Sequence, residues 1–311
     1  MLVLVAGITG NIGRLLAPAL IERGHQVRGL GRSPAKLARS SKEQLESFVT
    51  NTAYYDITAL EKACQGVDAV VCAYKGSPEL LLEGQLLLFR TAERAGVKHF
   101  VPASFNYDWR TLTLGQQDSY DPYISFYNHL QLVSSPASPH LSFVFTGVLA
   151  EVLFGSPGHA YFTTKNHGPW DLENKKMEIW GDQNRKWNWT SEKDVARFVA
   201  GLLSLPAEKI KEKEFWNVSS GVDTLSEIAR TYGKLRGREV EIVRMGSVEE
   251  MREKAFEARK RGKRSAFWEY IGWFYNLWTV EGIWLLGELD NGEIGVEGEG
   301  LEAFLKRYSD V

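Results

Sequence analysis

Three glycines near the start of the chain have the spacing of a turn that binds phosphate groups. Gly7, Gly10 and Gly13 directly follow Leu2–Ala6, an apolar run typical of a short buried parallel strand. Apolar residues then recur at helical spacing until Gly24. Glycines let backbone approach a pyrophosphate, and a helix N-terminus favours anions. The pattern predicts a dinucleotide-binding turn formed by Gly7, Thr9, Gly10, Asn11, Ile12 and Gly13; a purely structural glycine turn is the alternative.

Two cations after the second predicted strand indicate which dinucleotide binds. The strand Gln26–Leu30 is followed by Arg32, with Lys36 one helical turn later and no acidic residue nearby. An acidic residue here would bind a ribose 2′-hydroxyl, whereas a cationic pair suits a 2′-phosphate. The sequence therefore favours NADP(H) over NAD, unless Arg32 and Lys36 are ordinary solvated charges.

Two later strands end in loops that belong at the same edge of the sheet. The apolar runs Ala69–Cys72 and His99–Pro102 predict parallel strands, and folds of this kind bind ligands at the carboxyl ends of such strands. We therefore expect cofactor contacts in the loops that follow them, at Ala73, Tyr74, Ser104 and Phe105.

The N-terminal motifs resemble those of a known family. G-I-T-G-N-I-G, followed by G-H-Q-V-R-G-L-G-R-S-P-A-K, is similar to the NmrA-like and isoflavone-reductase-like families of atypical short-chain dehydrogenases. The resemblance is specific in the first hundred residues and looser towards the C-terminus. It implies an NADP(H)-binding domain, a smaller substrate lobe and an active cleft between them.

The expected catalytic lysine is missing from its place in the sequence. Ordinary short-chain dehydrogenases use Tyr-x-x-x-Lys, which this region lacks, and the isoflavone-reductase-like enzymes use a lysine on the helix after a P-S-x-F-G loop. The loop Pro102–Asp108 resembles that loop, and matching Phe126 to the family's phenylalanine places His129 at the lysine position. A histidine suits acid–base catalysis near neutral pH. The candidate catalytic residues are therefore His129, Tyr127 and Tyr123, although a structural role for His129 remains the alternative.

The second half supplies candidates for the substrate pocket. The resemblance implies that the region after the sixth strand contributes to it, where Lys165 is a further acid–base candidate or a solvated charge. Aromatic residues crowd the segment from Phe267 to Trp284, which suits either a wall for an aromatic substrate or a core or dimer face. The expected substrate contacts are Asn106, Tyr107, Gly147, Trp273 and Trp278.

Alternating strands and helices predict the framework that positions these residues. The pattern indicates an α/β fold with a Rossmann-type, doubly wound parallel sheet and a smaller mixed α+β C-terminal lobe. We expect an NADP(H)-binding domain at residues 1–150 and an interleaved substrate lobe at 151–311. Residues 33–48 are predicted to form the second helix, and capping boxes are predicted to start helices at Thr58, Thr224 and Ser247.

Composition limits the class of protein. The 311 residues carry a net charge of −2, which gives no general attraction for nucleic acid. No apolar run is long enough to span a bilayer, no signal peptide is recognisable, and no spacing of ligands suggests a metal site. The two cysteines, Cys64 and Cys72, suggest buried thiols in a reducing compartment, so we expect a cytoplasmic protein.

These features together favour an enzyme. The first hypothesis is an NADPH-dependent reductase acting on a bulky aromatic or polycyclic small molecule in specialised metabolism, as the resemblance implies. The second is a non-redox acid–base enzyme for cyclisation, condensation or rearrangement, with a structural NADP(H), which loss of the lysine favours. The third is a non-catalytic regulator that senses NADP(H). The sequence leaves open whether the protein is a monomer or a homodimer.

Overall fold

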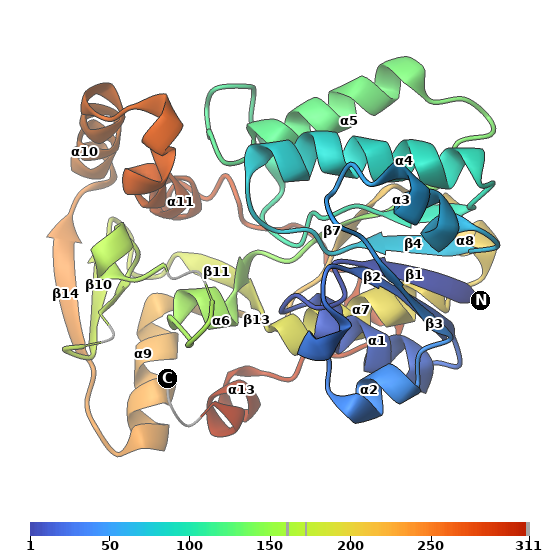
Figure 1. Cartoon of the computed structure of the whole chain (residues 1–311). Coiled ribbons are helices and arrows are strands. Elements are labelled where there is room, and N and C mark those ends of the chain that lie inside the picture. The colour runs from blue at the N-terminus through green and yellow to red at the C-terminus, as the bar shows by residue number, and fades with distance from the viewer. Residues whose placement is uncertain (160–161, 172, 309–311) are drawn as a thin grey trace.

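The glycine turn follows β1, a central strand of a six-stranded parallel sheet (Figure 1). The structure is a computed structural model and describes residues 1–159, 162–171 and 173–308. The strand order is β3-β2-β1-β4-β5-β6, so the central β1 has β2 on one side and β4 on the other. The strands are β1 (Leu2–Ala6), β2 (Gln26–Gly31), β3 (Ser47–Thr50), β4 (Ala69–Cys72), β5 (His99–Val101) and β6 (His140–Leu141). The predicted doubly wound α/β fold is confirmed.

Helices cover both faces of this sheet (Figure 1). On one face lie α3 (Ile57–Cys64), α4 (Gln85–Arg94) and α5 (Asp121–Val133), and on the other lie α1 (Gly13–Glu22) and α7 (Glu192–Leu203). The side chains of β1 alternate between two buried clusters, with Leu4 facing the first group of helices and Val3 and Val5 facing the second. This alternation is why the strand is apolar throughout.

Two local predictions were wrong. In place of one helix over residues 33–48, the chain forms a single 3₁₀ turn, η1 (Pro34–Lys36), and a short helix, α2 (Arg39–Glu43). No residue of α2 is buried, so no apolar face holds a longer helix against the sheet. Helix α3 begins one residue before Thr58, because Asp56 caps it by accepting a hydrogen bond from Ala59 N–H at 3.2 Å.

Smaller sheets build the second part of the molecule. Strand β7 (Phe143–Phe145) pairs with β12 (Phe215–Asn217), and two three-stranded sheets have the orders β13-β11-β8 and β14-β10-β9. Their strands are β8 (Val148–Leu149), β9 (Trp170–Asp171), β10 (Lys176–Trp180), β11 (Lys186–Thr190), β13 (Gly221–Thr224) and β14 (Glu241–Gly246). The remaining helices are α6 (Ala150–Leu153), α8 (Ala207–Lys211), α9 (Leu225–Arg236), α10 (Val248–Arg261), α11 (Ile271–Val280), α12 (Asn291–Ile294) and α13 (Leu301–Arg307).

The chain after residue 150 contributes to both parts of the molecule. Helix α7 packs against α1, where Phe198 and Val199 join the buried cluster of Leu16 and Leu20. Helices α9 and α10 lie in the second part, and each starts with the predicted capping box, at Thr224 and at Ser247 respectively. The return of α7 to the sheet brings the second part of the chain close to the glycine turn.

Candidate cofactor and substrate pocket

The glycine turn is packed too tightly for side chains at two of its three glycines. Gly7 has a φ of +83°, and a Cβ atom there would lie 2.8 Å from the carbonyl oxygen of Ala73. At Gly13, a Cβ atom would lie 2.2 Å from the carbonyl oxygen of Gly7. The turn therefore holds the start of α1 against β1 and the loop after β4, as a dinucleotide-binding turn requires.

The remaining glycine of the turn, Gly10, faces a more open space. A Cβ atom on Gly10 would meet only the carbonyl oxygens of Gly7, at 3.2 Å, and of Ala73, at 4.0 Å. Ile12, the residue that precedes α1, makes no side-chain hydrogen bond to the helix N-terminus. Backbone N–H groups at such a terminus can bind phosphate oxygens. The residues present fit the pyrophosphate of a dinucleotide.

Two cationic side chains follow β2, the strand whose end lies next to the glycine turn. Arg32 is the residue after the strand and Lys36 ends η1, and both are exposed. Neither is in an ion pair with a residue that the structure describes. The methyl group of Thr9 would lie 3.4 Å from a Cβ atom on Gly31, so the glycine turn is next to this strand end. Arg32 and Lys36 fit a 2′-phosphate.

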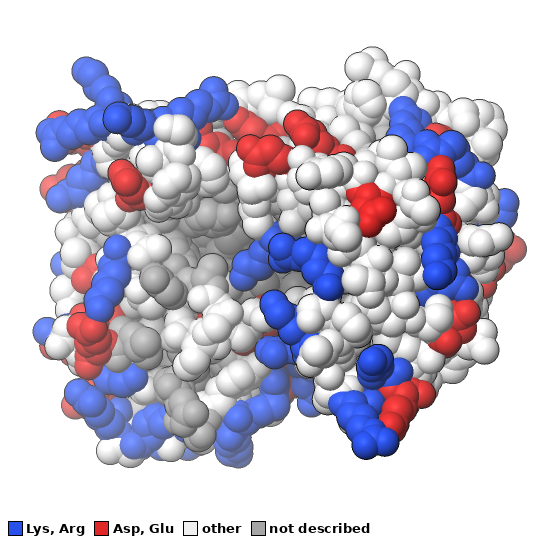
Figure 2. Space-filling view, viewed as in Figure 1, with Lys and Arg blue, Asp and Glu red and all other residues white. Residues whose placement is uncertain are grey.

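A single pocket of about 760 Å³ joins the glycine turn to aromatic side chains. Figure 2 shows a hollow in this face, with lysine and arginine side chains at its edge. Ten of the predicted site residues line the pocket: Gly10, Asn11, Ile12, Ala73, Tyr74, Phe105, Asn106, Tyr107, Tyr123 and Gly147. The volume is sufficient for ligands of drug size.

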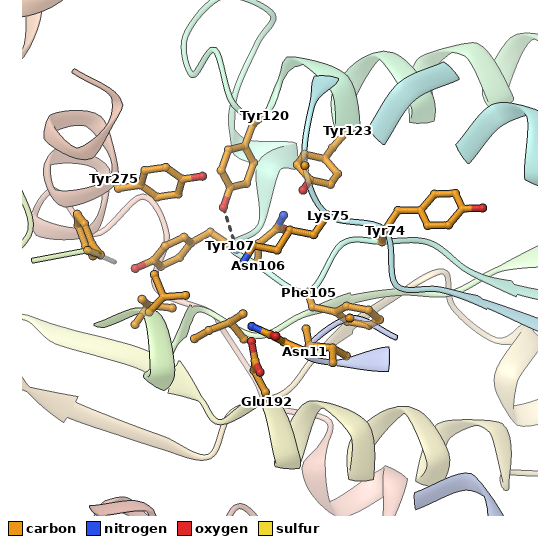
Figure 3. A pocket seen from close by; sticks show the side chains of 18 of the residues that line it. Asn11, Tyr74, Lys75, Phe105, Asn106, Tyr107, Tyr120, Tyr123, Glu192 and Tyr275 are labelled. Carbon is orange, nitrogen blue, oxygen red and sulfur yellow. Dashed lines mark hydrogen bonds between the residues drawn. The ribbon is translucent and has the colours of Figure 1, made fainter. Parts of the chain in front are cut away.

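The pocket contains one cationic and one acidic side chain among its described lining residues, Lys75 and Glu192. In the view of Figure 3, Lys75 lies on the side of Tyr123, and Glu192 and Asn11 lie on the opposite side. The loop after β4 is predicted from the sequence to lie at the ligand edge, and a lysine in that loop was a usable signal, but Lys75 was not among the predicted site residues. No motif in the sequence pointed to Glu192.

Four tyrosines form the wall opposite the glycine turn: Tyr107, Tyr120, Tyr123 and Tyr275. The hydroxyl of Tyr120 accepts a hydrogen bond from the N–H of Tyr107 at 3.3 Å. Burial raises the pKa of each tyrosine, and for Tyr123 the neighbouring Tyr275 raises it further while Asn106 opposes the shift. These phenols therefore stay protonated at neutral pH and can donate hydrogen bonds, but they are poor proton donors for catalysis.

The pocket also has buried polar atoms that lack partners. The Oδ1 atom of Asn106 and the hydroxyls of Tyr74 and Tyr107 are buried and have no hydrogen-bond partner among the described residues. Buried polar groups are normally paired. Asn106 and Tyr107, in the loop after β5, line the pocket, so two of these unpaired atoms belong to residues of its wall.

Comparison with known proteins agrees with this geometry. Residues 1–260 match the model of the NmrA-like family. The chain belongs to that family. A bifunctional pinoresinol-lariciresinol reductase from Linum usitatissimum is 27% identical over 97% of this chain and 92% of its own.

Solved structures share the fold of this NmrA-like protein. A structure described as AtPrR2 with NADP+ and (+)pinoresinol superposes with a TM-score of 0.74 at 22% identity, over 98% of both chains. An isoflavone reductase superposes with a TM-score of 0.73 at 18% identity, over 99% of both chains. At these identities the likeness establishes the fold.

Three of the four predicted catalytic residues lie outside the pocket lining. His129 is exposed on α5, six positions after Tyr123, so the helix rotation directs it away from the pocket. Tyr127 packs its ring against Trp109 and Phe143, with ring centres 5.4 and 5.6 Å apart. Lys165 is exposed and forms an ion pair with Glu173 at 2.5 Å. Of the four, Tyr123 alone lines the pocket.

The predicted tryptophans and Ser104 also lie outside the lining. Trp273 stacks on the ring of His167 with centres 4.5 Å apart, and the buried Trp278 donates a hydrogen bond to Gln117 at 3.1 Å. Ser104 is fully buried and accepts a hydrogen bond from the indole of Trp109 at 2.9 Å. The aromatic segment does reach the pocket, but through other residues: Trp268, Ile271, Gly272 and Tyr275.

The described residues were compared with two further features, metal-binding clusters and membrane-spanning helices. They contain no cluster of three or more histidine, cysteine or carboxylate side chains that could hold a metal ion. None of the described helices is both long enough and apolar enough to cross a membrane.

Proposed function

We propose that this NmrA-like protein is an NADPH-dependent reductase that acts on a bulky aromatic small molecule. The observation that carries this proposal is one continuous pocket, which runs from a glycine turn suited to a dinucleotide to a wall of four tyrosines. Relatives named as pinoresinol-lariciresinol reductases support this substrate class. Aromatic walls bind aromatic ligands through ring stacking, and the tyrosine hydroxyls add hydrogen bonds that orient them.

The residues of the chain have separate roles in this reaction. Gly10 and the N-terminus of α1 would hold the pyrophosphate, and Arg32 with Lys36 would hold the 2′-phosphate. NADPH, when bound, supplies the hydride. The tyrosines and Asn106 would orient the substrate and exclude water from it.

Lys75 is the proposed proton donor in place of a lysine on α5. Its side chain lines the pocket on the same side as Tyr123, whereas the described part of α5 offers no lysine. An ammonium group can donate a proton to an oxygen of the substrate and stabilise the negative charge that develops there. Tyr123 would position that oxygen through its hydroxyl.

Loss of reduced-nicotinamide absorbance tests the proposed function. Purified protein is mixed with NADPH and a panel of plant lignans, isoflavones and related aromatic compounds, and both absorbance and products are followed. We expect NADPH to be consumed in step with the formation of a reduced product. A product formed equally well with NADP⁺ would instead favour the non-redox acid–base enzyme, the second candidate, which the absence of a lysine on α5 supports.

Cofactor selectivity gives a second test. We expect NADP⁺ to bind at least roughly tenfold more tightly than NAD⁺, and Arg32→Ala to remove most of that difference by removing a charge-assisted contact to the 2′-phosphate. Calorimetric titration measures both affinities. Lys260→Ala, on the exposed face of α10, is the control, because it also removes one surface cation but lies outside the proposed site. Equal affinities for the two nucleotides in the unaltered protein would contradict this assignment.

We also propose a division of the chain into two parts, a location and a class of partner. We propose a cofactor-binding part at residues 1–150 and a substrate lobe at 151–311, with α7 returning to the first part. The buried free thiols of Cys64 and Cys72 support a reducing, cytoplasmic location. The net charge of −2 argues against nucleic acid as a partner, and monomer and homodimer remain alternatives.

A further inference from the structure

A buried histidine–glutamate pair lies in the wall of the pocket near the glycine turn. Glu192 is the first residue of α7 and lines the pocket, and its Oε2 atom lies 2.9 Å from Nε2 of His159. The two side chains are only 3% and 6% exposed. Charged groups buried to this extent are normally paired, because an unpaired charge there is costly.

Both ring nitrogens of His159 face oxygen atoms that can accept a hydrogen bond. The other ring nitrogen of His159, Nδ1, lies 3.1 Å from the carbonyl oxygen of Pro157. A carbonyl oxygen accepts only, and so does an ionised carboxylate, so each contact needs its own proton, whereas a neutral imidazole carries one. A pair that makes both hydrogen bonds is either an imidazolium with a carboxylate or a neutral imidazole with a protonated carboxyl group. In both cases its net charge is zero.

A second buried carboxyl group lies next to this pair. Glu151 on α6 is fully buried, and its Oε2 atom accepts a hydrogen bond from the N–H of Glu192 at 3.0 Å. Burial, followed by the nearby charge of Glu192, raises the pKa of Glu151. After α13, the hydroxyl of Tyr308 donates to Glu151 at 2.9 Å, and the adjacent Arg307 pairs with Glu299. A positive charge on His159 would offset the repulsion between the charges of Glu192 and Glu151.

The pair is also connected to the proposed phosphate site. The side-chain amide of Asn11, in the glycine turn, donates a hydrogen bond to the carbonyl oxygen of Gly158 at 3.4 Å, next to His159. Glu192 and Asn11 line the same pocket, and both are labelled in Figure 3. A negative Glu192 would therefore repel the phosphates of a nucleotide bound at this turn.

We propose that His159 neutralises Glu192 and thereby allows an anionic nucleotide to bind beside it. This inference rests on the proposed cofactor and concerns the charge of two residues beside its site. His159 is a positioning residue in this role, because it acts through Glu192 and does not itself line the pocket. Glu192 keeps a polar acceptor in the pocket without adding a net negative charge.

Nucleotide binding without turnover tests the pair. Calorimetric titration with NADP⁺ at pH 7.5 compares the unaltered protein, His159→Gln, Glu192→Gln and the double variant. Glutamine at position 159 can donate a hydrogen bond but carries no charge, so we expect His159→Gln to weaken binding on the order of tenfold. Glu192→Gln removes the acid, so this variant and the double variant should bind within about threefold of the unaltered protein.

Each outcome decides between explanations. If His159→Gln binds like the unaltered protein, or the double variant binds as weakly as His159→Gln alone, this inference is wrong. If the unaltered protein does not bind NADP⁺, the proposed cofactor fails together with it.

Discussion

Replacing Lys75 with methionine is expected to lower the rate of substrate reduction by a factor on the order of 10²–10⁴, the usual contribution of general acid catalysis. Methionine has a similar length, so the pocket should keep its shape while losing its one cationic lining residue among those described. Single-turnover measurements with bound NADPH compare the two proteins directly. The loss should be in the rate of the chemical step and much smaller in the affinity for NADP⁺, because the phosphates are assigned to Arg32, Lys36 and the turn.

His129→Ala is the matched control for this experiment. His129 lies where the sequence comparison places the family lysine, but it is exposed and outside the pocket lining. We expect its replacement to leave the rate within about twofold. If His129→Ala lost activity and Lys75→Met retained it, the assignment of the proton donor to Lys75 would be wrong, and the match in sequence would be the better guide.

The difference between Lys75 and His129 shows what a sequence match can miss. The match counts residues along the chain, but access to the pocket depends on the rotation of α5. That rotation directs Tyr123 into the pocket and leaves His129 exposed. Lys75 reaches the same pocket from a different element, the loop after β4. Counting positions on one helix cannot detect a group supplied by another.

Sequence patterns predicted the local structure correctly where neighbouring residues alone determine that structure. The strand, glycine turn and helix at the N-terminus formed as expected, because the spacing of glycines and apolar residues defines them within a short stretch. The boxes at Thr224 and Ser247 also formed, since each needs only a hydroxyl and a glutamate three positions later. At Thr58 the same pattern competed with Asp56 two residues earlier, and the aspartate capped the helix.

The pocket could be predicted only in part because distant segments build it. Loops after β1, β4 and β5 follow from the rule that parallel sheets bind ligands at their carboxyl edge. The contributions of Glu192 and Tyr275 depend on how α7 and α11 return to this edge. The aromatic segment showed the same limit, because Trp278 turned inwards to Gln117 while Tyr275, on the same helix, faced the pocket. Sequence spacing carries little information on these tertiary contacts.

Gly13→Ala is expected to destabilise the protein by about 3 kcal/mol and to abolish nucleotide binding. Alanine favours a helix over glycine by about 1 kcal/mol, so propensity alone would predict a gain in stability. The added Cβ atom, however, would lie 2.2 Å from the carbonyl oxygen of Gly7 and 2.8 Å from Cα of Ile8. Because both are backbone atoms, α1 would have to move away from the turn, which would displace the N–H groups assigned to the pyrophosphate.

Gly292→Ala is the control that separates these two effects. Gly292 is also helical, in α12, and a Cβ atom there would meet nothing within 4 Å. Chemical denaturation should show Gly292→Ala to be as stable as the unaltered protein or slightly more stable, since propensity acts there without a clash. If Gly13→Ala were equally stable and still bound NADP⁺, the close packing of α1 on the turn would not be what holds the phosphate site in place.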